Sequence, residues 1–281
     1  MHNLTGKTFL VTGAGSGIGK ALAKCLDAKG VKLILNDIDE SALQDVADSL
    51  QQSPLCIPFS VASKSNWLMC KSTIDKHFAG SNFTGIDGII NNAGIAHDAI
   101  AFENISEEDF KKVMDINFYG VLFGSQTFLP ELKTKERAWI VNISSIFGIT
   151  SIGQLHAYCA SKFAVKGLTE SLRMEAMAHF PNVTVTVVHP GGINTPIASN
   201  AITVDNRSSQ ARTQDINKFN KQLVTSPQKA AQVIVNGIIR KKTRILIGPD
   251  AKILDWIARL LPVSYSKILL NQLLKRGLLN D

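Results

Sequence analysis

The sequence predicts an α/β fold built on a doubly wound, Rossmann-like parallel sheet of about seven strands with helices on both faces. Three observations lead to this prediction. Short β-branched apolar runs recur along the chain, segments with apolar residues at helical spacing separate them, and a glycine-rich turn follows the first run. Strands that alternate with helices form a parallel sheet, because each right-handed crossover lays a helix on one face.

The expected strands follow one another through most of the chain. We place them at residues 8–12, 32–36, 55–59, 86–90, 138–143, 183–188 and 244–247. Between them apolar residues return at helical intervals, as at Ile18, Leu22 and Leu26 after the first strand. Each intervening segment is therefore expected to hold a helix that packs on the sheet.

We expect a single domain with an addition at its carboxyl end. Residues 1–250 carry the sheet, and residues 194–226 within them form a polar stretch typical of a long substrate loop or helical lid. Residues 251–281 hold two amphipathic segments separated by Pro262, with lysines and arginines beside leucines. This last part is predicted to be a basic helical extension.

Composition excludes several classes of protein. A hydrophobic content of 45% with 19% charged residues is typical of a chain with a large buried core and not of a disordered one. The four cysteines lack C-x-x-C or His-paired spacing, so we expect reduced thiols and neither a disulfide framework nor a metal site. No long apolar run or leading signal segment is apparent, and we expect a cytoplasmic protein.

The positive charge is concentrated at the end of the chain. The formal net charge is +7, and the last 42 residues contain nine Lys or Arg against three Asp. These basic residues do not show the regular interleaving with aromatic residues that is typical of nucleic-acid binding, so such binding is not expected. An acidic partner, cover of a pocket for an apolar substrate by the tail, peripheral contact of the tail with membrane, and packing within an oligomer all remain open as explanations.

The turn T-G-A-G-S-G-I-G at residues 12–19 lies between the first strand and the first helix. Glycines at positions 13, 17 and 19 let the backbone turn tightly and approach a pyrophosphate, whose charge is favoured at the start of a helix. The same glycines would also suit a purely structural tight turn. Their place between strand and helix favours dinucleotide binding.

An acidic residue ends the second strand. Asp37 stands eighteen residues after Gly19, where a carboxylate can bind a ribose diol and repel a 2′-phosphate. NAD is therefore expected over NADP. The alternative is that Asp37 or Asp39 caps the helix that begins near Ser41.

From here the chain resembles the short-chain dehydrogenase/reductase family, in the type with T-G-x-x-x-G-x-G and Y-x-x-x-K motifs. Beyond the glycine turn, the matching segments are N-N-A-G at 91–94, D-I-N-F-Y-G at 115–120, N-I-S-S at 142–145, Y-C-A-S-K at 158–162 and P-G-G-I-N-T at 190–195. Their joint order and spacing make the resemblance specific up to about residue 196.

The resemblance implies four catalytic residues. Tyr158 would be the acid/base, Lys162 its partner, Ser145 the ligand of the reacting oxygen, and Asn117 the holder of a water that links Lys162 to solvent. Ser145 is preferred over Ser144 because its thirteen-residue separation from Tyr158 fits the family.

The physical chemistry of these groups is consistent with those roles. A free phenol has a pKa of about 10 and needs nearby positive charge to act as a base at neutral pH. Lys162 shares a helix face with Tyr158 and could supply that charge. Taken alone, the spacing is equally typical of an ordinary exposed pair.

The motifs also assign the contacts with the cofactor. Pro190, Gly191, Ile193 and Thr195 follow the sixth strand, at the edge where doubly wound sheets bind ligands. One departure is visible at Ser60, where the family often has an Asp. The full expected set is Gly13, Ser16, Gly17, Ile18, Gly19, Asp37, Val61, Asn92, Ala93, Gly94, Tyr158, Lys162, Pro190, Gly191, Ile193 and Thr195.

The expected activity is NAD(P)(H)-dependent hydride transfer between a primary or secondary alcohol and its aldehyde or ketone, on an apolar substrate. Sugar-nucleotide epimerases and enoyl reductases are disfavoured by the glycine spacing and by the interval between Tyr158 and Lys162. A catalytically silent cofactor sensor or scaffold is the alternative from another functional class. The resemblance further implies a homodimer or homotetramer with contact faces on the helices after Glu103 and after Tyr158.

Overall fold

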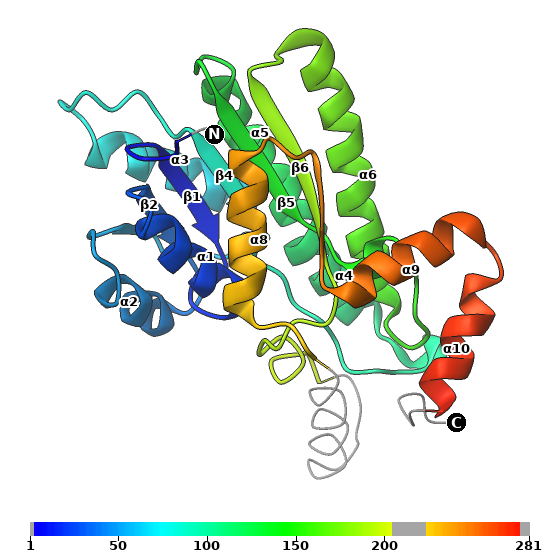
Figure 1. Ribbon diagram of the computed structural model, residues 1–281. Helices are drawn as coiled ribbons and strands as arrows, with labels where there is room; N and C mark the ends of the chain where they lie inside the picture. Colours follow the sequence, from blue (N-terminus) through cyan, green and yellow to red (C-terminus); the bar gives the residue numbers. More distant parts are fainter. Residues whose placement is uncertain (1–2, 204–222, 276–281) are drawn as a thin grey trace.

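The computed structural model describes residues 3–203 and 223–275. Seven parallel strands form one sheet in the order β3-β2-β1-β4-β5-β6-β7, which confirms the predicted fold class (Figure 1). The order reverses between β1 and β4, the position where this architecture opens a crevice. The strands are β1 Thr8–Thr12, β2 Lys32–Asn36, β3 Leu55–Cys56, β4 Gly88–Asn91, β5 Ala138–Ile143, β6 Val183–Pro190 and β7 Arg244–Ile247.

Three strands differ from the predicted ranges: β6 extends to Pro190, two residues beyond its predicted end, and β3 and β4 also differ. β3 ends at Cys56, although the amide of Ile57 still donates to the carbonyl of Leu35 at 2.9 Å. The amide of Phe59 also donates to the carbonyl oxygen of Asp37 at 3.2 Å, so the predicted pairing continues to residue 59 outside the regular ladder. β4 begins at Gly88 because the amide of Asp87 bonds to Thr8 outside the regular ladder.

Helices cover both faces of the sheet, as the hydrophobic periodicity predicts (Figure 1). The first face holds helices α1, α2 and α8, and the second holds α3, α5 and α6. The helices are α1 Gly17–Asp27, α2 Glu40–Asp48, α3 Lys64–His77, α4 Glu107–Met114, α5 Gly120–Leu132, α6 His156–His179, α8 Pro227–Ile239, α9 Pro249–Leu260 and α10 Tyr265–Lys275. Short 3-10 turns lie at Phe102–Asn104 (η1) and Ile146–Gly148 (η3), and a π-helical turn at Asp115–Tyr119 (η2) joins α4 to α5.

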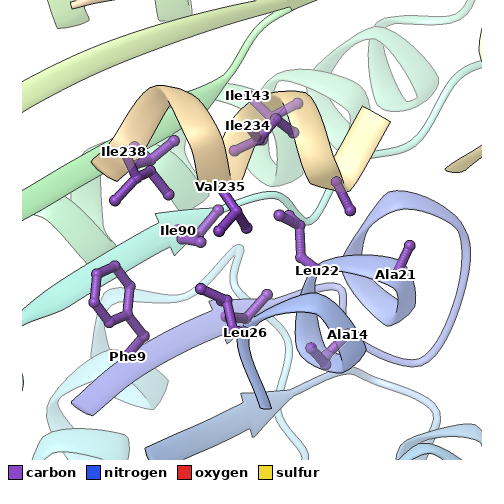
Figure 2. Close-up of a cluster of buried hydrophobic side chains, with 14 of the residues drawn as sticks. Phe9, Ala14, Ala21, Leu22, Leu26, Ile90, Ile143, Ile234, Val235 and Ile238 are labelled. Atoms are coloured by element: carbon purple, nitrogen blue, oxygen red, sulfur yellow. The ribbon is translucent and has the colours of Figure 1, made fainter. Parts of the chain in front are cut away.

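The core on the first face forms between α1, α8 and the central strands. Leu22 and Leu26, one helical turn apart, lie beside Val235 of α8 and above Phe9 of β1 (Figure 2). All four side chains are fully buried. Burial of each such side chain stabilises the folded state by about 1.5–3 kcal/mol. The contacts also fix the position of α1 relative to the ends of the strands.

Buried amides connect the sheet to α6. Asn91 donates to the Oδ1 of Asn142 at 2.8 Å, and Asn142 donates to the hydroxyl of Thr169 at 3.0 Å. Because these groups are shielded from water, leaving one unpaired would cost about 1–3 kcal/mol. The chain of bonds therefore sets the position of α6 against β4 and β5.

The carboxyl-terminal helices extend from one corner of the sheet (Figure 1). On α9, the buried Asp255 accepts hydrogen bonds from Arg244 of β7 at 2.9 Å and from Arg259 at 3.2 Å. Hydrogen bonding to Arg244 is the main reason that the pKa of Asp255 lies below its usual value. On α10, the hydroxyl of Tyr265 lies 3.1 Å from that of Ser151. The expected division at residue 250 stays a prediction.

We expect Asp255→Ala to lower the free energy of unfolding by about 2 kcal/mol, because it leaves Arg244 without its acceptor. Urea denaturation at neutral pH measures this change. Glu170→Ala is the matched control, since it removes a partly exposed i,i+4 pair with Lys166 at 3.9 Å and should cost no more than about 0.5 kcal/mol. Equal losses in the two variants would show that the pair does not anchor α9.

Candidate active site

A cleft with a volume of about 1840 Å³ follows the carboxyl edge of the sheet. The strand order places Asp37 and Val61, after β2 and β3, at one end of the cleft, and α9, after β7, at the other. The predicted residues that line it are Gly13, Ser16, Gly17, Ile18, Asp37, Val61, Asn92, Ala93, Gly94, Ser145, Tyr158, Lys162, Pro190, Gly191, Ile193 and Thr195. Of the predicted site residues, Gly19 and Asn117 do not line the cleft themselves.

The glycine turn is built so tightly that side chains would not fit. Gly13 has a φ of +64°, and a Cβ there would lie 2.8 Å from the Cα of Ala93. A Cβ on Gly19 would lie 1.9 Å from the carbonyl oxygen of Gly13. The turn thus brings its backbone to the cleft at the start of α1, where unpaired N–H groups and the helix dipole favour an anion.

The carboxylate of Asp37 faces this turn. Its Oδ2 accepts a hydrogen bond from the amide of Gly15 at 2.8 Å. The cap of α2 is Asp39 instead, whose Oδ1 accepts from the amide of Ala42 at 3.0 Å. Of the two roles open to Asp37 in the sequence, the structure thus gives helix capping to Asp39 and leaves Asp37 in the cleft.

Asn92 joins the end of β4 to the glycine turn. Its side-chain amide donates to the carbonyl oxygens of Thr12 at 2.9 Å and Gly13 at 3.1 Å. The hydroxyl of Thr12 accepts from the amides of Asn92 and Ala93, both at 3.0 Å. These bonds hold the two loops together at the reversal point of the sheet.

The two serines after β5 have different surroundings. Ser144 donates to the carbonyl oxygen of Lys162 at 2.8 Å and is buried. Ser145 lines the cleft, caps η3 by accepting from the amide of Phe147 at 3.1 Å, and is hydrogen-bonded to the phenol of Tyr158. Both serines are buried and line the cleft, but the hydroxyl of Ser144 is committed to the backbone of α6, whereas that of Ser145 is hydrogen-bonded to Tyr158.

Tyr158 and Lys162 lie on one face of α6, against the cleft. Burial raises the pKa of Tyr158 to about 12, and the hydrogen bond from the Ser145 hydroxyl to the phenolate opposes this rise. Lys162 is only 3% exposed, and its Nζ lies 5.6 Å from the centre of the Tyr158 ring. Burial lowers the pKa of Lys162 to about 8.

The ammonium of Lys162 is held by a neutral partner. Its Nζ donates to the carbonyl oxygen of Ile143 at 3.1 Å, and within residues 3–203 and 223–275 no carboxylate pairs with it. A buried positive charge with no counter-ion favours anionic groups nearby. It can therefore stabilise a phenolate at Tyr158 or bind hydroxyl groups of a ligand in the cleft.

Asn117 lies in the π-helical turn η2, fully buried. Its Oδ1 accepts from the amide of Ile95 at 2.8 Å, and its Nδ2 donates to the carbonyl oxygen of Ile95 at 2.9 Å and the hydroxyl of Ser161 at 3.0 Å. The side chain thus joins η2, the loop after β4 and α6. A π-helical turn shifts the regular backbone pairing and is frequent at functional sites.

Thr195 and Ile193 belong to the loop after β6. Ile193 forms a parallel bridge with Thr225, and the Thr195 side chain lies against the glycine turn, 3.3 Å from where a Cβ on Gly17 would be. Asp250 of α9 supports this loop by accepting from the amide of Gly192 at 2.6 Å. The predicted loop 194–226 is described only at residues 194–203 and 223–226, and its remainder lies outside the described residues.

The end of the cleft near β7 is apolar. Loop residues before α6 form one side of it, and the inward faces of α9 and α10 form the other. The apolar side chains that line this end are Ile146, Phe147, Ile152, Leu155, Leu254, Ile257, Leu269 and Leu273. α9 and α10 therefore cover this end of the cleft, which is one of the arrangements expected for the carboxyl-terminal extension.

Within the described ranges, the cysteines and other metal-ligating side chains form neither a metal site nor a second reactive site. No group of three metal-ligating side chains gathers among these residues. Cys159 is buried, burial raises the pKa of its thiol, and its Sγ donates weakly to the carbonyl oxygen of Ile152 at 3.8 Å. It packs α6 and does not carry an activated thiolate.

Sequence reasoning missed His189, at the end of β6. Its ring is fully buried, and its Nδ1–H donates to the carbonyl oxygen of Ser145 at 2.9 Å. The pKa of His189 is lowered to about 4, mainly by burial and also by the positive charges of Arg244 and Lys166. A histidine within the apolar run V-T-V-T-V-V-H-P was the one signal that could have revealed it.

Acid should destabilise the protein through His189. Unfolded chains bind a proton at this residue below about pH 6.5, whereas the folded protein does so only near pH 4. The free energy of unfolding should thus fall by roughly 2–4 kcal/mol from pH 6.5 to pH 4 because of this group. Urea denaturation across this range should show a weaker pH dependence in His189→Asn, which keeps a donor, and wild-type behaviour in the exposed control His179→Asn.

Comparisons with known proteins agree with this geometry. The sequence profile described as short chain dehydrogenase matches residues 7–205. SadH of Mycobacterium tuberculosis is 37% identical over 275 residues, which cover 95% of each chain. A 3-alpha-(or 20-beta)-hydroxysteroid dehydrogenase of the same organism is 31% identical over 194 residues, covering 69% of this chain and 72% of its own.

Solved structures show the same similarity. A short chain dehydrogenase/reductase from Burkholderia phymatum, crystallised in complex with NAD, superposes with a TM-score of 0.82 at 25% identity over 96% of this chain and 97% of its own. Levodione reductase gives a TM-score of 0.75 at 25% identity, over 89% and 98% of the two chains. The chain therefore belongs to the short-chain dehydrogenase/reductase family of NAD(P)-dependent oxidoreductases.

Proposed function

We propose that the protein is an NAD(H)-dependent oxidoreductase that interconverts an apolar primary or secondary alcohol with its aldehyde or ketone. The observation that carries this proposal is the contact of three groups on one wall of the cleft. The phenol of Tyr158 is hydrogen-bonded to Ser145, and the buried ammonium of Lys162 lies 5.6 Å from its ring. An acid, an oxygen ligand and a positive charge are what proton transfer at an alcohol oxygen requires.

The cleft fits a dinucleotide. Gly13 and Gly19 leave room at the start of α1 that any side chain would fill, which suits a pyrophosphate. Asp37 would bind the ribose diol, Lys162 the ribose next to the nicotinamide, and Ile193 and Thr195 its carboxamide. When bound, NAD supplies the hydride acceptor for oxidation, and NADH supplies the donor for reduction.

Tyr158 would exchange the proton. Because its pKa lies near 12 in the protein alone, Tyr158 is protonated at neutral pH and can donate to a carbonyl oxygen. Alcohol oxidation requires the phenolate, which the positive charge of Lys162 would favour. Ser145 would donate a hydrogen bond to the reacting oxygen and hold it beside the phenol.

Asn117 would act through its backbone. All the hydrogen bonds of its side chain go to Ile95 and Ser161, so its side chain is committed to structure. A water linked to Lys162 would have to be held by the backbone carbonyl, in the turn where π-helical geometry alters the backbone pairing. This refines the role that the resemblance implies for Asn117.

The apolar end of the cleft supports an apolar substrate. Side chains of α9 and α10 extend the lining beyond Tyr158, and the wall there offers mostly aliphatic contacts. A similar protein carries the name hydroxysteroid dehydrogenase, a class with a bulky apolar substrate. A long-chain, terpenoid or steroid-like alcohol would fit these surroundings.

Assembly and location complete the proposal. α6 exposes Phe163, Met174 and Met177, and Tyr119 is exposed at the start of α5. Such apolar residues on the helices after Glu103 and Tyr158 suit a homodimer or homotetramer interface.

Among the described residues, no helix has the length and apolar character needed to cross a membrane. We propose a cytoplasmic protein that contacts membrane only peripherally, through its carboxyl-terminal helices.

Tyr158→Phe tests the reaction. We expect turnover to fall by about 10²–10⁴-fold, because the variant lacks the proton that the phenol exchanges. Activity is measured in both directions across alcohols and carbonyls of different chain length and ring system. NADH binding, followed by its fluorescence, should change by less than about threefold, since the ring is retained. If the wild type turns over nothing in this panel while binding NADH, a cofactor sensor or scaffold becomes the better assignment.

Asp37→Ala tests the cofactor preference. Removing the carboxylate should shift the ratio of kcat/KM for NADPH over NADH by at least about tenfold toward NADPH, because a negative charge no longer opposes the 2′-phosphate. Asp39→Ala is the matched control: it loses the cap of α2 and about 1 kcal/mol of stability but should keep the wild-type ratio. A wild-type enzyme that prefers NADPH would contradict the proposed role of Asp37.

A further inference from the structure

The C-terminal half of α9 and the turn after it expose a run of large apolar side chains. Trp256 is 66% exposed, Leu260 71% and Val263 81%, with Leu261 also exposed between them. We call Trp256, Leu260, Leu261 and Val263 the outer C-terminal face. Single exposed apolar residues are normal on a protein surface, but four within eight positions, one of them tryptophan, are typical of a surface that binds a partner.

The opposite side of the same helices has a different role. Leu254 and Ile257 of α9, with Leu269 and Leu273 of α10, line the apolar end of the cleft. Each helix thus carries apolar residues toward the cleft and further apolar residues toward solvent. The residues that face the cleft are apolar because they line its wall. Nothing in the described chain covers the apolar residues of the outer C-terminal face.

Charge indicates the kind of partner. Between residues 249 and 275 the basic side chains are Lys252, Arg259, Lys267 and Lys275, and the acidic ones are Asp250 and Asp255. Asp255 is buried against two arginines, and Asp250 accepts the amide of Gly192. The charges left toward solvent on this helical pair are therefore basic, and they surround apolar residues.

This combination suits the surface of a bilayer with anionic lipid. Tryptophan and leucine enter the region between headgroups and acyl chains, while lysine and arginine meet the lipid phosphates. A second copy of the same face would instead bring basic side chains against basic side chains, which is unfavourable. Charge complementarity thus favours the bilayer over self-association.

We propose that the outer C-terminal face docks on membranes that contain anionic lipid. Trp256, Leu260, Leu261 and Val263 enter the interface, and the basic side chains of Lys252 and Lys267 contact the headgroups. Since α9 and α10 separate this face from the apolar end of the cleft, docking brings that end next to the lipid. The position of the apolar end of the cleft next to lipid matters only if the proposed apolar substrate is right. Docking itself specifies the peripheral membrane contact proposed above and does not depend on the proposed reaction.

Vesicle co-sedimentation of the full chain tests the proposal directly. The probes are vesicles of phosphatidylcholine alone and of phosphatidylcholine with about 30% phosphatidylserine. We expect the protein to bind the mixed vesicles and to bind vesicles of phosphatidylcholine alone at least about tenfold more weakly. Binding to the mixed vesicles should weaken at about 0.5 M salt. Absence of binding to the mixed vesicles would overturn the proposal.

Matched variants locate the contact. Trp256→Ser with Leu260→Ser should reduce partitioning by at least about tenfold, and Lys252→Glu with Lys267→Glu should reduce it on mixed vesicles only. The control is Leu68→Ser with Met69→Ser, which removes two side chains of 57% and 67% exposure from α3 and should bind like wild type. If the first variant folds poorly by circular dichroism, Leu261→Ser with Val263→Ser replaces it. If variants of the outer C-terminal face fold correctly and still bind vesicles as well as the wild type does, the proposal is overturned.

Two further measurements separate the alternatives. Light scattering after size exclusion detects a second copy: a halved mass in Trp256→Ser with Leu260→Ser would show that the face is an oligomer interface and would overturn the proposal. NADH binding by these variants should stay as in wild type, because none of the four outer-face residues lines the cleft. Vesicle binding by an enzyme that fails every substrate screen would leave docking supported and the proposed function refuted, so the two failures are distinguishable.

Discussion

A buried ammonium group that pairs with no carboxylate of residues 3–203 and 223–275 is the feature on which the site depends. Lys162 is held by the carbonyl oxygen of Ile143, and burial brings its pKa down to about 8. Such a charge is costly to bury, and the fold retains it by packing α6 closely on the sheet. Ala157, Cys159 and Ser161, on either side of Tyr158, are buried, so small side chains in the Y-C-A-S-K segment permit that close packing. The close packing of α6 on the sheet also fixes the position of Tyr158, which lies on the same helix.

The cleft combines two environments because of the way the sheet is wound. At the β2 and β3 end, backbone amides and Asp37 provide polar groups suited to a charged dinucleotide. At the β7 end, the aliphatic side chains of α9 and α10 provide a surface suited to an apolar molecule. Ser145 follows β5, which lies between these ends in the strand order, and it is hydrogen-bonded to Tyr158 of α6. Parallel strands make this possible, since all their carboxyl ends meet at one edge.

The carboxyl-terminal helices are more closely integrated than an appended segment would be. Asp250 supports the loop after β6, Asp255 joins α9 to β7, and Tyr265 contacts Ser151 in the loop before α6. These polar contacts hold the pair in place while its inward face completes the cleft. Changes in α9 and α10 can therefore affect substrate preference without altering the chemical groups.

The sequence by itself determined the order of strands and helices, the glycine turn and the Tyr158–Lys162 spacing, because these depend on local periodicity and on neighbours in the chain. The choice of Ser145 over Ser144 came from the family spacing, and the hydrogen bond of Ser145 to Tyr158 agrees with it. Only the tertiary structure decided that Asp39 caps α2 and that the side chain of Asn117 is occupied by Ile95 and Ser161. It also revealed His189 beneath Ser145 and placed α9 and α10 along the cleft. Each of these contacts joins groups whose distance and direction depend on how the helices pack on the sheet, and packing leaves no local pattern in the sequence.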